Sequence, residues 1–133
     1  MKKILLMLVA SCVFMYAQNS EPFLITGKMP HVTKKIKQNW DNKELALKDA
    51  QKEKLLKVRS ETMGAVMKLI EEISLLEDEV AKATILGEKP ESLKDKVEQI
   101  SKLKAKATIV HINCIYNTKN ILDEKQFKML LKL

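Results

Sequence analysis

The chain has 133 residues, a formal net charge of +7 and only 5% aromatic residues. This length suits one domain and is too short for two. A basic chain would suit nucleic acid, but no recognition motif accompanies the charge. The sequence also contains no glycine-rich phosphate loop, nucleophile elbow or clustered acid–base pair. We therefore expect neither a nucleic-acid partner nor an enzyme.

The amino terminus has the pattern of an export signal. Two lysines precede an apolar run over residues 4–17, which is shorter than the roughly 20 residues that span a membrane. We therefore predict a signal peptide over residues 1–17, cleavage after Ala17 and a periplasmic protein. A Val-Ala-Ser-Cys sequence also suggests lipoprotein anchoring at Cys12. That alternative is less favoured, because apolar residues rather than a polar tether follow the cysteine.

Residues 18–30 contain two prolines and a glycine without regular apolar spacing, which predicts a flexible leader. A helical domain is expected over residues 31–133. Thr33 is placed to cap a short helix that puts Ile36 and Trp40 on one face. We expect Trp40, the only tryptophan, to anchor that helix on the fold rather than to bind a ligand.

The next segment, residues 49–83, contains no proline and has apolar residues at alternating three- and four-residue spacings. These are Val66, Leu69, Ile73, Leu76, Val80 and Ala83. The pattern predicts one helix, roughly 50 Å long at 1.5 Å per residue, and hence an elongated protein. Gly64 costs about 1 kcal/mol inside a helix, which suggests close packing or a bend there.

Gly87 and Pro90 predict that the chain turns back, because glycine suits a helix end and proline a helix start. A returning helix is expected to end near residue 118. Its apolar face would consist of Leu93, Val97, Ile100, Leu103, Ala107, Val110 and Cys114. A short terminal helix would follow, with Phe127, Leu130 and Leu131 on its apolar face. The predicted fold class is all-α: an elongated long-helix hairpin with short amino- and carboxy-terminal helices.

Charge is distributed in blocks: residues 28–59 are basic, residues 61–79 are acidic and the remainder is basic again. Such blocks favour pairing between antiparallel segments or between two subunits. Along the first long helix we expect the surface pairs Glu53–Lys57 and Asp78–Lys82, which contribute about 0.3 kcal/mol each.

Two similar segments flank the long helices: Leu-Lys-Asp-Ala-Gln at residues 47–51 and Leu-Asp-Glu-Lys-Gln at residues 122–126. A cap residue followed by glutamine at the third helical position forms a capping box. In the second segment, Asp123 can accept hydrogen bonds from the next turn while Gln126 reaches back to the cap amide.

The first segment has a poorer cap, because the corresponding residue is Lys48. A lysine side chain has no acceptor for the free amides of a helix start. Asp41 or Asn42 is the alternative cap, which would give one helix starting at about residue 43.

The two segments resemble the LTxxQ motif of the Spy/CpxP family of periplasmic proteins. The matching positions are Leu47, Gln51, Leu122, Asp123 and Gln126. Lys48 and Asp123 replace the two motif threonines. The runs QKEKLLKVRSE after the first motif and HINCIYNTKNIL before the second are also similar to the family. The resemblance covers residues 31–133.

The resemblance implies an exported, ATP-independent chaperone without a cofactor. Family members are thin, curved, all-helical antiparallel dimers whose basic concave surface holds unfolded or aggregation-prone envelope proteins. Mobile lysines and scattered apolar residues suit weak binding of many clients. Methionines suit it too, although we expect Met63 and Met67 mainly to fill the core. A homodimer is also expected because two helices of about 30 residues leave apolar surface uncovered in one hairpin.

The alternative function for this fold is an envelope-stress regulator that docks on a sensor kinase, or a heavy-metal-responsive sensor. Candidate metal ligands are His31, His111 and Cys114, of which the last two lie one helical turn apart. A firm site needs three or four ligands, and Cys114 is expected to be a buried apolar residue. We therefore expect no bound metal.

Overall fold

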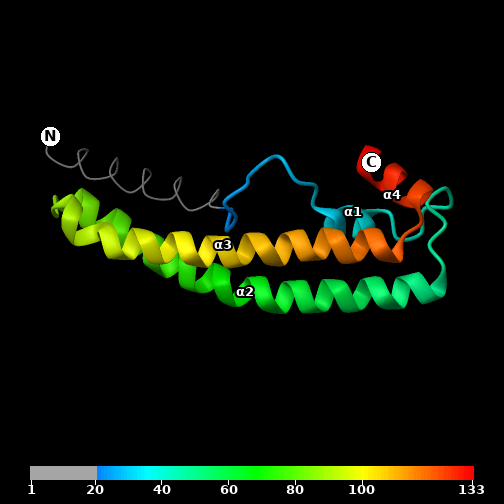
Figure 1. The fold of residues 1–133 in the computed structure, drawn as a ribbon, viewed down its shortest axis with the longest axis horizontal. Helices are drawn as coiled ribbons and strands as arrows, with labels where there is room; N and C mark the ends of the chain where they lie inside the picture. Colours follow the sequence, from blue (N-terminus) through cyan, green and yellow to red (C-terminus); the bar gives the residue numbers. More distant parts are fainter. Residues whose placement is uncertain (1–20) are drawn as a thin grey trace, which may run out of the picture.

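The computed structural model describes residues 21–133, and the predicted signal peptide with its alternative anchor Cys12 lies outside them. The described residues form four helices and no strand. These are α1 (Val32–Gln38), α2 (Asp49–Ile85), α3 (Pro90–Ile121) and α4 (Glu124–Lys132). Figure 1 shows α2 and α3 running antiparallel along the length of an elongated molecule. The prediction of an all-α long-helix hairpin with two short terminal helices is confirmed.

The hairpin consists of 37 residues in α2 and 32 residues in α3. At 1.5 Å per residue, α2 is roughly 55 Å long. The inner faces contribute the buried residues Val66, Ile73, Ala83, Leu93, Leu103 and Ala107, which belong to the predicted apolar faces. Val97 is an exception with 50% exposure, because two helices alone cannot cover every apolar position near the turn.

The turn between the long helices forms as the sequence predicts. Gly87 has φ +80 and its N–H donates to Thr84 O at 3.1 Å, while Glu88 N–H donates to Ala83 O at 3.0 Å. This is the Schellman arrangement that closes helix ends. Pro90 is the first residue of α3, where its missing N–H costs nothing.

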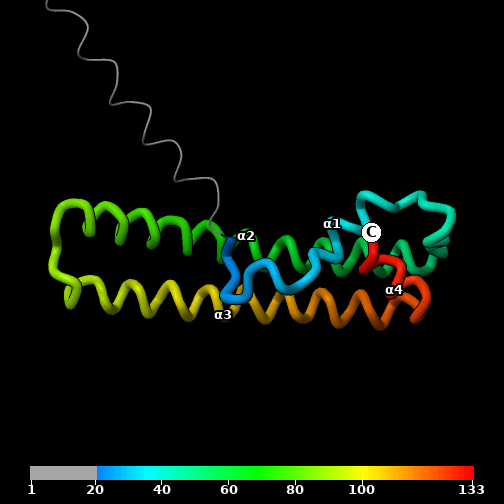
Figure 2. Tube along the Cα trace, turned by 90° about the horizontal axis from the view of Figure 1, so that it is seen from above, coloured from blue at the N-terminus to red at the C-terminus, as the bar shows by residue number. Residues whose placement is uncertain are grey.

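The other end of the molecule is thicker, because three short segments cover one face of the hairpin. Figure 2 shows the leader and α1 lying across α2 and α3, with α4 beside them. The main core lies here and consists of Val32, Ile36, Leu45, Leu55, Val58, Cys114, Leu122 and Leu130. Trp40 packs against this core, as predicted.

The alternating charge blocks pair across the hairpin. Lys96 Nζ lies 2.9 Å from Glu79 Oε2, and Lys104 Nζ lies 2.5 Å from Glu77 Oε1. These pairs link the acidic part of α2 to the basic α3, as the block pattern predicts for antiparallel segments.

The two surface pairs expected along α2 are not formed among the described residues. Lys57 Nζ instead lies 3.9 Å from Glu61 Oε1, one turn further along the helix. Such exposed pairs contribute little to stability, so their exact partners are weakly determined by sequence.

Helix starts differ from two predictions. His31, rather than Thr33, is the cap residue of α1, and Thr33 lies inside that helix. The alternative helix start near residue 43 is wrong, because α2 begins at Asp49. Asn42 instead closes a turn: its Oδ1 accepts from Glu44 N–H at 2.9 Å and from Leu45 N–H at 3.3 Å.

One prediction about the interior of α2 is wrong. Met63 and Met67 do not fill the core, since they are 43% and 55% exposed. Of the two explanations expected for Gly64, close packing does not apply within residues 21–133, because a Cβ built there meets nothing within 4 Å.

Candidate functional site

The two motif glutamines, which are 75 residues apart in sequence, lie against each other. Gln51 Nε2 donates to Gln126 Oε1 at 2.8 Å, and Gln126 Nε2 donates to Gln51 Oε1 at 3.1 Å. The sequence analysis identified both residues but did not predict that they contact each other, because each motif indicates only a local helix cap.

Each glutamine also binds the start of its own helix. Lys48 N–H donates to Gln51 Oε1 at 3.0 Å, and Asp123 N–H donates to Gln126 Oε1 at 3.0 Å. In the second segment Asp123 Oδ1 accepts from Gln126 N–H at 2.7 Å, which completes the predicted capping box. The Lys48 side chain makes no cap hydrogen bond.

The remaining bonds of the two amides complete an approximate twofold arrangement. Gln51 Nε2 donates to Ile121 O at 3.1 Å, and Gln126 Nε2 donates to Leu45 O at 3.1 Å and Ala46 O at 3.3 Å. Ile121 and Ala46 are the residues just before the two motif leucines. We call Gln51, Gln126 and these backbone partners the glutamine clasp.

The motif leucines support the clasp from the core. Leu122 is buried and Leu47 packs against the same core. Ala46, beside the clasp, has φ +49, a left-handed conformation that costs alanine roughly 1–2 kcal/mol. All five motif residues therefore have a structural role.

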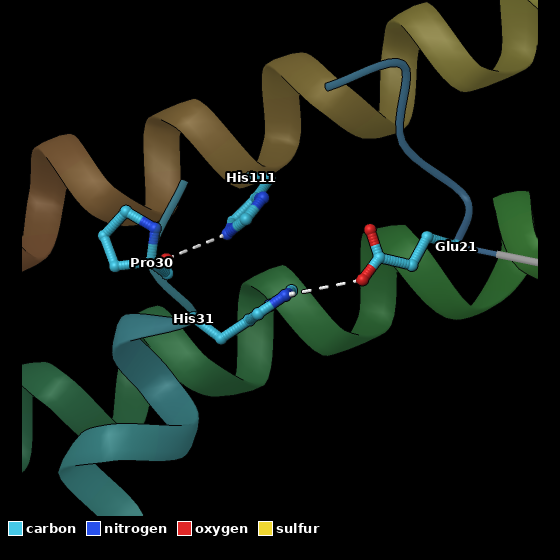
Figure 3. A network of polar contacts seen from close by, with 4 residues as sticks. All are labelled: Glu21, Pro30, His31 and His111. Carbon is cyan, nitrogen blue, oxygen red and sulfur yellow. Dashed lines mark hydrogen bonds and ion pairs between the residues drawn. The ribbon is translucent and has the colours of Figure 1, made fainter. Parts of the chain in front are cut away.

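The two histidines form a second cluster where the leader crosses α3 (Figure 3). The rings of His31 and His111 stack with centroids 5.0 Å apart, and the Phe23 ring lies 4.7 Å from His111. His31 Nε2 is 4.0 Å from Glu21 Oε1. His111 Nε2 is 3.2 Å from Pro30 O, so the proton of a neutral His111 belongs on Nε2.

Burial lowers the pKa of His111 below its ordinary value of 6.5, the Pro30 carbonyl opposes this shift, and nearby His31 adds to it. Neutral His111 is therefore the dominant form at pH 7. Its Nδ1 is buried and has no hydrogen-bonding partner among the described residues. Protonating His111 would bury a charge beside a second imidazole, which is unfavourable.

The leader has a further contact with α3. Leu24 N–H donates to Thr108 Oγ1 at 2.9 Å, and Thr108 is itself buried. Together with the Pro30–His111 bond, this contact fixes two points of the leader on the helix.

The third candidate ligand, Cys114, lies in the core. Burial raises the pKa of the Cys114 thiol, while the nearby hydroxyls of Thr62 and Thr118 act in the opposite direction. Within residues 21–133 there is no group of three or more His, Cys, Asp and Glu side chains placed to hold a metal ion. The structure thus brings His31 and His111 together but does not assemble a three-ligand site from the predicted candidates.

A pocket that the sequence analysis missed opens between α1, α2 and α3. Its volume is about 200 Å³, and its lining residues are Thr33, Ile36, Lys37, Trp40, Leu55, Leu56, Arg59 and Thr118. Trp40 therefore both packs against the core and lines this pocket. The available signal was the four-residue spacing of Ile36 with Trp40 and of Leu55 with Arg59, which places each pair on one helix face.

Apolar side chains are also exposed on the outside of the long helices. On α2, Leu56, Met63 and Met67 have exposures of 55%, 43% and 55%. Their spacing of seven and four residues places them on one face. On α3, the exposed residues Ile109, Ile112 and Tyr116 have three- and four-residue spacings and form a similar row.

The described helices contain no segment long and apolar enough to cross a membrane. Comparison with family models, curated proteins and solved structures finds no match to this chain.

Proposed function

We propose that this protein is a periplasmic, ATP-independent chaperone that binds unfolded or aggregation-prone envelope proteins. The observation that supports the proposal best is the exposed row of Leu56, Met63 and Met67 on an elongated hairpin. Contiguous apolar surface on a folded protein commonly marks a place where other chains bind. Two methionines in the row make its shape adaptable, because their side chains are unbranched and polarizable.

Basic side chains surround this row. Lys57 and Lys68 are exposed, and Arg59 is partly exposed on the same helix. Long basic side chains combine an apolar stem with a mobile charge, so they can contact both apolar and acidic parts of an unfolded chain. Such a surface favours weak binding of many sequences over tight binding of one.

We further propose that the functional unit is a homodimer, as the resemblance to the Spy/CpxP family implies. Two hairpins placed side by side would present their exposed rows to one client. An elongated surface of this kind can hold a partly folded protein at several weak contacts, whose combined affinity exceeds that of each contact.

The test is light scattering of a thermally aggregating client with the purified protein at roughly equimolar ratio and no ATP. We expect suppression of aggregation by the native protein. The double variant Met63→Gln, Met67→Gln should require about thirtyfold more protein for the same suppression, because two apolar contacts of about 1 kcal/mol each are lost. Ala65→Gln adds the same side chain at an exposed position between them and should leave activity unchanged.

Failure to suppress aggregation of several unrelated clients would remove the chaperone proposal. Equal loss of activity in the Ala65→Gln variant would show that the exposed row is not the binding surface.

The alternative is a metal-responsive or stress-regulatory protein of the same fold, possessing a different partner such as a sensor kinase. The stacked pair His31 and His111 favours the metal version, since two imidazoles can begin a site that other ligands complete. Calorimetry of the reduced protein with zinc, copper and nickel tests the metal-sensing alternative. Absence of heat of binding for all three metals would eliminate metal sensing.

A further inference from the structure

The pocket between α1, α2 and α3 has an apolar interior. Ile36 and Leu55 are buried at its wall, and Trp40 and Leu56 add aromatic and aliphatic surface. The Trp40 ring is held in position from outside: Lys52 Nζ lies 5.3 Å from the ring centroid and 3.4 Å from Asp41 Oδ1. A pre-positioned ring reduces the entropy that a ligand must overcome on binding.

The pocket is lined by two cations and no acid. Lys37 and Arg59 are the charged lining residues, and neither forms an ion pair within residues 21–133. Arg59 is partly buried, and its planar guanidinium can donate two parallel hydrogen bonds to a carboxylate. The charge of the site therefore selects anions.

The inner wall of the pocket is closed by Thr118. This residue has 0% exposure, so its hydroxyl is not accessible to a molecule in the pocket.

We propose that this pocket binds a small aromatic carboxylate. The aromatic ring would lie against Trp40 and Leu55, and the carboxylate would bind Arg59 and Lys37. The size fits: an engineered cavity of about 150 Å³ holds benzene, and this pocket has about 200 Å³. The pocket shares Leu56 and Arg59 with the surface proposed for client binding, but the proposal does not depend on chaperone activity, because binding of a small ligand is measured directly.

The experiment uses the indole N–H resonance of Trp40, the only tryptophan of the chain, in two-dimensional NMR spectra of the purified protein. Titration with phenylpropanoate should shift this resonance saturably with a Kd on the order of 0.1–1 mM, the range expected for about eleven non-hydrogen atoms. The corresponding neutral alcohol should bind about tenfold more weakly, because it lacks the charge-assisted hydrogen bonds.

Two variants identify the carboxylate contact. Arg59→Gln should weaken binding about tenfold, whereas Lys68→Gln removes a cation from an exposed position of the same helix and should have no effect.

A Trp40 resonance that does not shift, or that shifts without saturation, would overturn the proposal. Equal affinities for the carboxylate and the alcohol, or equal losses in Arg59→Gln and Lys68→Gln, would overturn recognition of the anion.

Discussion

A glutamine side chain has two donor hydrogens and an oxygen with two lone pairs, and the clasp uses all of them. Gln51 Oε1 accepts from Lys48 N–H and from Gln126, while its amide donates to Gln126 and Ile121 O. Gln126 is similarly satisfied and is 7% exposed. Because buried polar groups are costly when a partner is removed, each glutamine depends on the other.

This dependence predicts a measurable coupling. Gln126→Ala should lower the free energy of unfolding by about 2–3 kcal/mol, because it leaves a buried amide and backbone carbonyls without partners. Gln51→Ala should cost about 1–2 kcal/mol, since Gln51 is less buried. The double variant should cost about 1 kcal/mol less than the sum. Urea denaturation provides all three values.

Lys125→Ala, at an exposed position of α4 next to Gln126, is the control and should change stability by less than about 0.5 kcal/mol. Strictly additive costs of the two glutamine substitutions would contradict the clasp.

The His111 cluster predicts acid sensitivity. The pKa of His111 is lowered in the folded protein by burial, so the unfolded chain binds more protons between that lowered value and 6.5. The contribution of His111 to the free energy of unfolding is therefore fully present above pH 6.5, and it is lost as the pH falls towards the pKa of the folded state. Urea unfolding should show that the free energy of unfolding decreases less between pH 7 and pH 5 in His111→Gln than in the native protein.

His31→Gln is the matched control for the second imidazole, since His31 is about half exposed and Glu21 faces it. This variant should keep most of the acid dependence. An unchanged pH profile in His111→Gln would contradict the assignment to His111.

At the scale of elements, helix boundaries and packing faces differ in how far sequence determines them. The turn at Gly87 and Pro90 was predictable, because backbone preferences act locally. The exposure of Met63 and Met67 was not, because the apolar arc of α2 is wider than α3 can cover and periodicity does not identify the covered part. The pairing of Gln51 with Gln126 was also not predictable, because it depends on the fold bringing together two helix starts that are far apart in sequence.

The two glycines of the hairpin predict opposite effects of one substitution. Gly87 has φ +80, so Gly87→Ala should destabilise the protein by about 1 kcal/mol through backbone strain. Gly64 is inside α2 with open space at its Cβ, so Gly64→Ala should stabilise by about 0.5–1 kcal/mol. Thermal unfolding should therefore move Tm in opposite directions. A lower Tm in Gly64→Ala would indicate a contact from another chain at this position.

At the scale of the whole molecule, the two ends differ in how well they are covered. At the end with α1 and α4, the core includes side chains from all four helices, whereas the end at the turn has only two helices. Apolar side chains are correspondingly exposed there: Leu75, Ile85, Leu86 and Val97. Ile85 has 86% exposure, which is costly for an isolated molecule.

We expect a second copy of the chain to cover part of this surface. Sedimentation at micromolar concentration should give the mass of a dimer, and the double variant Leu75→Gln, Val97→Gln should dissociate at about tenfold higher concentration, since two apolar contacts are lost. Ala65→Gln is the control. A monomeric mass of the native protein at micromolar concentration would contradict dimerisation.

The glutamine clasp also has a consequence for the order of folding. Contacts near Gly87 join residues close in sequence, so the hairpin can form early from its turn, whereas the clasp joins residues 75 apart and closes a long loop at higher entropic cost. Docked long helices bring Gln51 and Gln126 near each other before they bond. A chain emerging from its amino terminus therefore cannot complete its core until α4 has emerged, because Leu130 of α4 belongs to that core.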